Sequence, residues 1–203
     1  MRIVAGKLKG RRFPELKSTA VRPTTDRTRE AVFSTLNSLC TIADARVLDL
    51  YAGSGALGFE ALSRGAHCAC MVERDRRTAA QLIALAGHFG VQDQVQVVCE
   101  DVLVFLEPKL RRSECSLEPG ECFGLVFADP PYASHPAAAL LRALGDSRLL
   151  AHGAVVVVEG TGKEQSGEAL LAEISAVSSA VFSLSKTKHY GSTVVSYFQV
   201  AYL

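Results

Sequence analysis

The chain has 203 residues, of which 48% are hydrophobic and 21% are charged. This is enough apolar side chain for one full-sized domain with a buried core, so a wholly disordered chain is excluded. No apolar run is long enough to cross a bilayer, and the first 13 residues contain no apolar stretch typical of a secretory signal. The six cysteines form no C-x-x-C pair, and no histidine stands at zinc-finger spacing. We therefore expect a cytoplasmic protein with reduced thiols, no membrane segment and no metal.

The positive charge is concentrated at the start of the chain. The net charge is only +1, yet residues 1–30 hold nine basic and three acidic side chains, which leaves about −5 on the remainder. A basic segment on a mildly acidic body is typical of proteins that meet phosphates, although a solvated basic tail has the same composition. The basic residues are Arg2, Lys7, Lys9, Arg11, Arg12, Lys17, Arg22, Arg27 and Arg29.

Two small elements are expected first. Gly6 and Gly10 indicate a β-hairpin within residues 1–13. A helix then follows Pro23, with Thr24 or Thr25 as its N-cap and an acid in its first turn. Its apolar stripe of Val32, Phe33, Leu36 and Leu39 should pack on the domain, while its arginines face elsewhere. These elements form a small N-terminal extension, residues 1–43, ahead of the main domain, residues 44–203.

From residue 46 onward, strand-like and helix-like segments alternate. Strands are expected at 46–50, 68–73, 95–99, 123–128 and 154–159, and helices at 55–63, 78–89, 102–110, 137–144 and 168–175. Residues 111–122 indicate a surface loop. The last two strands, 180–185 and 193–202, are separated by about seven residues, which is too few for a crossover helix, so they should pair antiparallel. The pattern predicts an α/β fold with an open, doubly wound, mostly parallel sheet, in which ligands bind at the carboxyl ends of the strands.

The first such strand end carries the sequence "DLYAGSGALG", residues 49–58, which fits the G-x-G-x-x-G pattern. In dinucleotide enzymes this turn holds a pyrophosphate, and the carboxylate of Asp49 would repel it. S-adenosylmethionine instead carries a sulfonium and an ammonium group, which a carboxylate attracts. The motif therefore favours this methyl donor over a dinucleotide. We assign cofactor contacts to Asp49, Tyr51, Ala52, Gly53, Ser54 and Gly55.

Acidic residues also close the second and third strands. Glu73, in "VERD", is placed to accept both ribose hydroxyls, and Asp101, in "CEDV", is placed to accept from the adenine amino group. The neighbouring Arg74 and Val102 are included in the expected cofactor site. Either acid could alternatively cap the helix that follows it.

The fourth strand is followed by Asp129-Pro130-Pro131-Tyr132. Two prolines fix the backbone and remove two amide donors, so this turn presents only acceptors. Acceptors suit a substrate amino group, and Tyr132 offers a flat face on which an extruded base can stack. The alternative is a rigid turn with Tyr132 in the core. We expect these four residues to be catalytic.

In their order, "DLYAGSGALG", "VERD", "ED" and "DPPY" resemble the motifs of class I S-adenosylmethionine-dependent methyltransferases that modify exocyclic or amide nitrogens. With "MRIVAGKLKGRRF", "RPTTDRTREAVF", "GALGFEALSRGA" and "HYGST", essentially the whole chain resembles the RsmD family. The resemblance implies a Rossmann-like, seven-stranded methyltransferase sheet with an antiparallel terminal strand. It also implies methylation of guanine N2 in 16S rRNA, within the assembled small ribosomal subunit. The segment 111–122 departs from the family pattern, because it is longer and more acidic.

On the RNA side, the turn into the last strand should open toward the active site. It would bring Lys186, Lys188, His189 and Tyr190 to the entering base, with Arg11, Arg12, Arg22 and Arg27 as phosphate contacts. Two alternatives from the same chemistry are a DNA adenine-N6 and a protein glutamine-N5 methyltransferase, and a third is a non-catalytic RNA-binding module. A monomer is expected.

Overall fold

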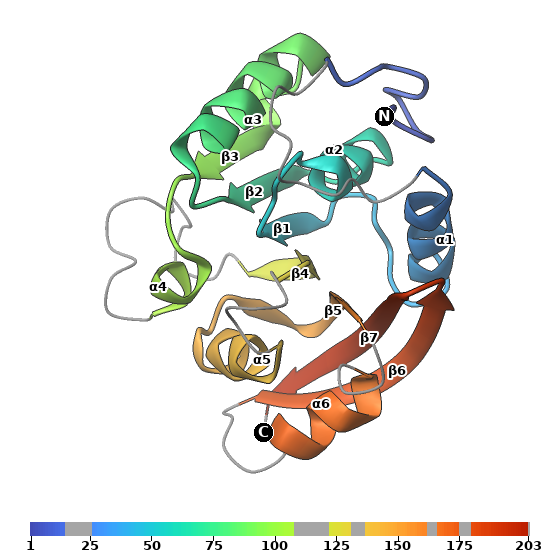
Figure 1. The fold of residues 1–203 in the computed structure, drawn as a ribbon, viewed down its shortest axis with the longest axis vertical. Helices are drawn as coiled ribbons and strands as arrows, with labels where there is room; N and C mark the ends of the chain where they lie inside the picture. The colour runs from blue at the N-terminus through green and yellow to red at the C-terminus, as the bar shows by residue number, and fades with distance from the viewer. Residues whose placement is uncertain (15–25, 108–121, 131–136, 162–165, 175–179, 203) are drawn as a thin grey trace. The chain divides into compact units, whose positions relative to one another are not determined.

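The computed structural model describes residues 1–14, 26–107, 122–130, 137–161, 166–174 and 180–202. It forms two compact units, Met1–Asp101 and Val102–Leu203. The fold is α/β with seven strands, three from the first unit and four from the second, mostly parallel with an antiparallel C-terminal pair, as predicted (Figure 1). Within these ranges no helix has the length and apolar character needed to cross a membrane. The expected boundary between residues 43 and 44 stays a prediction.

The first unit contains three parallel strands in the order β3-β2-β1. They are β1 (Arg46–Leu50), β2 (Cys68–Val72) and β3 (Val95–Val98), joined by α2 (Ala56–Ser63), α3 (Arg76–Phe89) and the short 3-10 helix η1 (Gln92–Gln94). Right-handed crossovers put α2 and α3 on one face of these strands, and the rings of Phe59 and Phe89 meet there at 5.1 Å. At their carboxyl ends, β1 and β2 are each connected to the following helix by a short turn.

The second unit contains strands in the order β4-β5-β7-β6. Its elements are α4 (Val102–Leu106), β4 (Phe123–Ala128), α5 (Ala137–Asp146), β5 (Leu150–Thr161), α6 (Gly167–Ile174), β6 (Ala180–Tyr190) and β7 (Thr193–Tyr202). β4 and β5 pair in parallel, whereas β7 is antiparallel to both of its neighbours. The expected loop at 111–122 lies almost entirely outside the described residues.

The C-terminal hairpin differs from the prediction in the length of its turn. β6 continues to Tyr190, and only Gly191 and Ser192 separate it from β7. Gly191 has a φ of 63°, which a tight two-residue hairpin turn commonly requires. The antiparallel pairing is confirmed, but the seven-residue connection is wrong, because the polar sequence "KTKHY" pairs with the apolar strand β7 along its whole length.

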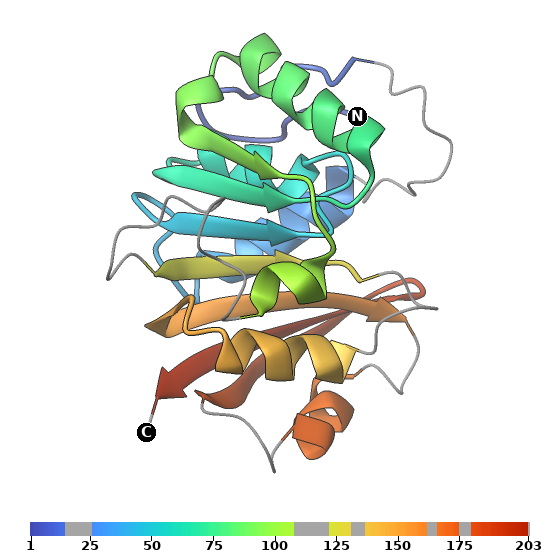
Figure 2. The same ribbon diagram turned by 90° about the vertical axis from the view of Figure 1, so that its left-hand side faces the viewer.

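The N-terminal segment docks on helix α2 of the same unit. Its ends meet in a single antiparallel bridge between Arg2 and Arg12. The backbone amides of Val4 and Ala5 donate to the carboxylate of Glu60, at 2.8 and 3.0 Å. A Cβ at Gly6, where φ is 80°, would lie 1.8 Å from the Ser63 carbonyl oxygen, so only glycine fits. Both views show this segment, in dark blue, beside α2 and α3 (Figures 1 and 2).

Helix α1 (Asp26–Leu36) buries three of the four expected side chains, Val32, Phe33 and Leu36. The fourth, Leu39, lies beyond the end of the helix and is half-buried. The expectation that the arginines of α1 face elsewhere is wrong for Arg29, which is fully buried, and correct for the exposed Arg27. A buried guanidinium needs partners. Arg29 donates to the Arg2 carbonyl at 2.5 Å and to Asp26 at 2.7 Å, and it lies 3.7 Å from the carboxylate of Glu60. The expected N-cap at Thr24 or Thr25 lies outside the described residues.

We predict that Glu60→Ala lowers the free energy of unfolding by about 3–5 kcal/mol, because it removes one of two carboxylates beside the buried Arg29 guanidinium and also the acceptor of the Val4 and Ala5 amides. Chemical denaturation of the full chain measures this. Glu30→Ala removes an exposed carboxylate from α1 and should change stability by no more than about 0.5 kcal/mol. Equal effects of the two substitutions would contradict the assigned role of Glu60.

Candidate active site

The turn after β1 has an unusual backbone. Tyr51, Gly53 and Gly55 all have positive φ, at 57°, 52° and 70°. The amide of Ala52 donates to the Val72 carbonyl at 3.0 Å, which ties the turn to the end of β2. A tyrosine in the left-handed region costs on the order of 1–3 kcal/mol and persists only where the surroundings fix it. Such strain concentrates at ligand sites, and the sequence did not reveal it.

Two strand-end carboxylates hold this turn from either side. Asp49, at the end of β1, is buried and accepts from the Gly58 amide in α2 at 3.0 Å. Glu73, just after β2, accepts from the Gly53 amide at 3.0 Å and from the Asp75 amide at 2.9 Å. Because a carboxylate offers about four acceptor positions, Glu73 can hold the turn and still accept from two hydroxyl groups.

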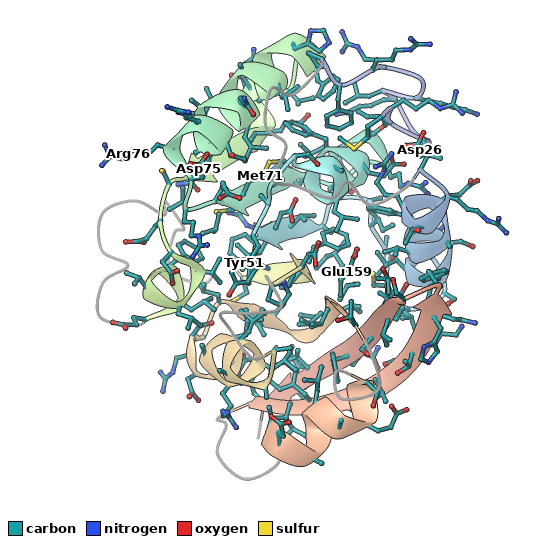
Figure 3. All side chains as sticks on the ribbon, viewed as in Figure 1. Asp26, Tyr51, Met71, Asp75, Arg76 and Glu159 are labelled. Atoms are coloured by element: carbon teal, nitrogen blue, oxygen red, sulfur yellow. The ribbon has the colours of Figure 1, made fainter. Side chains whose placement is uncertain are left out.

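Residues predicted to contact the cofactor after β1, β2 and β3 interact electrostatically with one another. Burial and, to a lesser extent, the nearby Asp101 carboxylate raise the pKa of Tyr51 to about 12, while Arg74 acts in the opposite direction. Figure 3 shows Tyr51 at the end of β1. Ala52 and Ser54 are buried within the turn, and Arg74 is exposed beyond Glu73. The remaining assigned residue, Val102, opens α4 in the second unit and is buried there.

In the second unit, Asp129 follows β4 directly. Burial raises the pKa of its carboxyl group, and the adjacent Pro130 is buried. Pro131 and Tyr132 lie outside the described residues. The parallel register pairs Ala128 with Val158, so Asp129 comes level with Glu159, which is 5% exposed at the end of β5. Glu159 was not identified from sequence; an acid closing the apolar run "AVVVVE" was the available signal.

The residues expected to contact RNA from the C-terminal hairpin lie on two faces of β6. Lys186 and Lys188 are opposite Tyr197 and Val195 of β7 and share one face, whereas His189 is opposite Val194 and lies on the other. Tyr190 ends the strand next to the turn. Since Thr161 of β5 pairs with Thr193 of β7, this turn is at the carboxyl end of β5, as expected. Their contact with RNA stays a prediction.

The basic residues of the N-terminal extension take part in the fold to different degrees. Arg11 donates to the Phe89 carbonyl at 2.6 Å, at the C-terminus of α3, where a cation also interacts favourably with the helix dipole. Arg12 and Arg27 are exposed, and Arg22 lies outside the described residues. Arg11 therefore already has a partner within the protein.

Comparison with known proteins gives consistent matches. Residues 1–199 match the family model described as Conserved hypothetical protein 95. The chain is 38% identical over 159 residues to ribosomal RNA small subunit methyltransferase D of Escherichia coli K12, covering 78% of this chain and 74% of the relative. The solved structure of yhhF from Escherichia coli superposes with a TM-score of 0.80 at 31% identity, covering 100% of this chain and 99% of the other. Magnesium protoporphyrin IX methyltransferase from Synechocystis PCC 6803, solved with bound SAM, shares the fold at 16% identity (TM-score 0.60; 85% and 78% covered).

We predict opposite effects for two glycine-to-alanine changes. A Cβ at Gly55 would lie 2.7 Å from both Leu82 and Phe59 on a left-handed backbone, so Gly55→Ala should destabilise the protein by about 1–3 kcal/mol. The matched control is Gly87→Ala, because nothing lies within 4 Å of a Cβ there in α3. It should stabilise the protein by about 0.5–1 kcal/mol. Urea titrations measure both, and a neutral Gly55→Ala would contradict the geometry of the turn.

Asp129 should make stability depend on pH. Its pKa is raised in the folded state by burial, so its contribution is fully present below the unfolded-state pKa of about 3.9 and is lost as pH rises through the folded-state value. Asp129→Asn should therefore raise Tm at pH 7 and change it little near pH 3.5. The control is Asp93→Asn, which alters an exposed side chain and should have a small effect at both pH values. A stability gain for Asp129→Asn that is equal at both pH values would rule this explanation out.

Proposed function

The chain belongs to the family that contains ribosomal RNA small subunit methyltransferase D, and we propose that it methylates the exocyclic N2 of one guanine in 16S rRNA, using S-adenosylmethionine. The proposed substrate form is the assembled small subunit in the cytoplasm, and the proposed enzyme is a monomer. The observation that carries the proposal is the acceptor turn of Asp129 and Pro130, half-buried and buried respectively, at the carboxyl end of β4.

The first unit supports the choice of cofactor. Asp49 is buried behind the glycine turn, where a negative charge opposes a pyrophosphate and attracts a sulfonium or ammonium group. Glu73 keeps acceptor positions for the ribose hydroxyls, and Asp101 is the proposed partner of the adenine amino group. S-adenosylmethionine, when bound, supplies an activated methyl group on sulfur.

The proposed reaction is a direct displacement. The guanine N2 amino group donates hydrogen bonds to the Asp129 carboxylate and the Pro130 carbonyl, and Tyr132 stacks on the base. Holding both N–H bonds in this way directs the nitrogen lone pair at the methyl carbon. The N–C bond forms as the C–S bond breaks, and the released proton passes to Asp129 or to water. Since sulfonium is a good leaving group, positioning supplies most of the rate enhancement.

We predict that Asp129→Ala lowers kcat for methyl transfer to small subunits by about 10²-fold or more, because it removes the acceptor of the amino protons. S-adenosylmethionine affinity, measured by calorimetry, should change less than about twofold, since Asp129 is assigned to the substrate alone. Glu73→Ala is the matched comparison and should weaken cofactor binding. Normal turnover by Asp129→Ala would disprove the assigned role.

The alternatives make different predictions in the same assay. A DNA adenine-N6 or protein glutamine-N5 methyltransferase would label duplex DNA or protein instead of RNA. A non-catalytic RNA-binding module would bind subunits without needing the cofactor.

A further inference from the structure

We propose that three arginines at the start of α3, Arg74, Arg76 and Arg77, form a surface that binds the phosphate backbone of the substrate RNA. This inference rests on the proposed RNA substrate, and it names the surface of the first unit that binds this RNA. From sequence, Arg74 was expected to contact the cofactor, and no role was predicted for Arg76 and Arg77. We call these residues the α3 arginine surface.

The three guanidinium groups are exposed and have no ion-pair partner within the described part of the chain. Other arginines of this unit are engaged in the fold: Arg2 pairs with Asp26, Arg64 with Glu60, and Arg11 caps α3. The N-terminal segment dominates the charge of the sequence, yet Arg2, Lys7 and Arg11 already have partners inside the protein. Arg12 and Arg27 are exposed.

Hydrogen bonds from Thr78, and after them the Arg77 charge, lower the pKa of the Asp75 carboxyl group, and Arg74 acts on Tyr51. Neither arginine forms a salt bridge there with any of the described residues, so both remain open to an external anion.

The position of these arginines works against the stability of their own helix. Arg76 and Arg77 are the first two residues of α3, which has no acid in its first turn, and a cation there opposes the helix dipole. Asp75, the N-cap, accepts from the Thr78 amide and hydroxyl, both at 2.8 Å. Its carboxylate is thus engaged with the helix. Figure 3 shows Arg76 extending away from α3 beside Asp75.

The arginines also stand at the edge of the first unit where the cofactor site is proposed. Arg74 follows Glu73 at the carboxyl end of β2, the same edge as the glycine turn. The contacts of the N-terminal segment with Ser63, Phe89 and Gln94 instead lie where α2 and α3 end and where β3 is about to begin. Of these two groups of cations, the α3 arginine surface is the one beside the proposed cofactor site.

The cofactor itself gives no reason for three cations here. S-adenosylmethionine carries a net positive charge, so nearby guanidinium groups weaken its binding rather than strengthen it. These three positive charges stand beside the site of a cationic cofactor and oppose the dipole of their helix. They are therefore better suited to bind a polyanion at the same edge. Arginine is well matched to phosphate because its planar donors can bind two oxygens at once.

The test compares wild type with the triple variant R74Q/R76Q/R77Q and the charge-retaining control R74K/R76K/R77K. Binding to a 16S rRNA transcript and to unmethylated small subunits is measured by filter binding from 50 to 300 mM salt. Loss of three phosphate contacts should make the slope of log K against log salt shallower by about 2.1 to 2.7, because each contact contributes roughly 0.7 to 0.9. The lysine variant should keep the wild-type slope. The double variant R76Q/R77Q, which leaves Arg74 in place, should bind S-adenosylmethionine as tightly as wild type.

The outcomes separate this inference from the proposed function. A glutamine variant with the wild-type salt slope, correctly folded by Tm, overturns the α3 arginine surface even if the wild type methylates RNA. If the glutamine variant binds S-adenosylmethionine more weakly and its salt slope is unchanged, these residues contact the cofactor and not the RNA. The slope is measured without methyl transfer, so a wild type that binds RNA but transfers no methyl group overturns the proposed reaction and not this surface.

Discussion

Two carboxylates at the ends of neighbouring strands hold the glycine turn on which the candidate site depends. Asp49 accepts from the Gly58 amide and Glu73 accepts from the Gly53 amide, so the turn is fixed from β1 and from β2. Between these two bonds lies Tyr51, whose backbone is left-handed with a φ of 57°. The two carboxylates also place negative charge where a cationic cofactor benefits and a pyrophosphate does not. The same interactions that determine the local backbone thus favour one class of cofactor.

A second carboxylate, Glu60, organises the fold around this turn. It accepts from two amides of the N-terminal segment and from Arg64, and it lies beside the buried Arg29 of α1. Among the basic residues that distinguish the N-terminus, Arg29, Arg2 and Arg11 have partners inside the folded unit, whereas Arg12 and Arg27 are exposed. Charge counted along a sequence measures how many cations there are, whereas contacts decide which of them can reach a nucleic acid.

The strands were predictable because a parallel strand that is buried on both faces appears in the sequence as a run of apolar residues, with glycines or charged residues at its two ends. β1 and β4 have the predicted limits. Asp49, Glu73, Asp101 and Asp129 were identified because each lies at or just beyond the end of such a run, whereas Glu159, which also closes one, was not. The failures came from long-range pairing. The polar sequence of β6 is a strand only because β7 lies beside it, and Arg29 is buried only because Glu60, Asp26 and the Arg2 carbonyl satisfy it. The roles assigned to individual site residues stay predictions.

The most direct measurement is methyl transfer from labelled S-adenosylmethionine to unmethylated small ribosomal subunits, with naked 16S rRNA and duplex DNA in parallel, followed by mass spectrometry of the nucleosides. The account predicts N2-methylguanosine in 16S rRNA from subunits and its absence from DNA. Label in DNA adenine or in protein would contradict the proposed substrate while keeping the cofactor site. Tight cofactor binding with no label in any of them would contradict the proposed reaction itself.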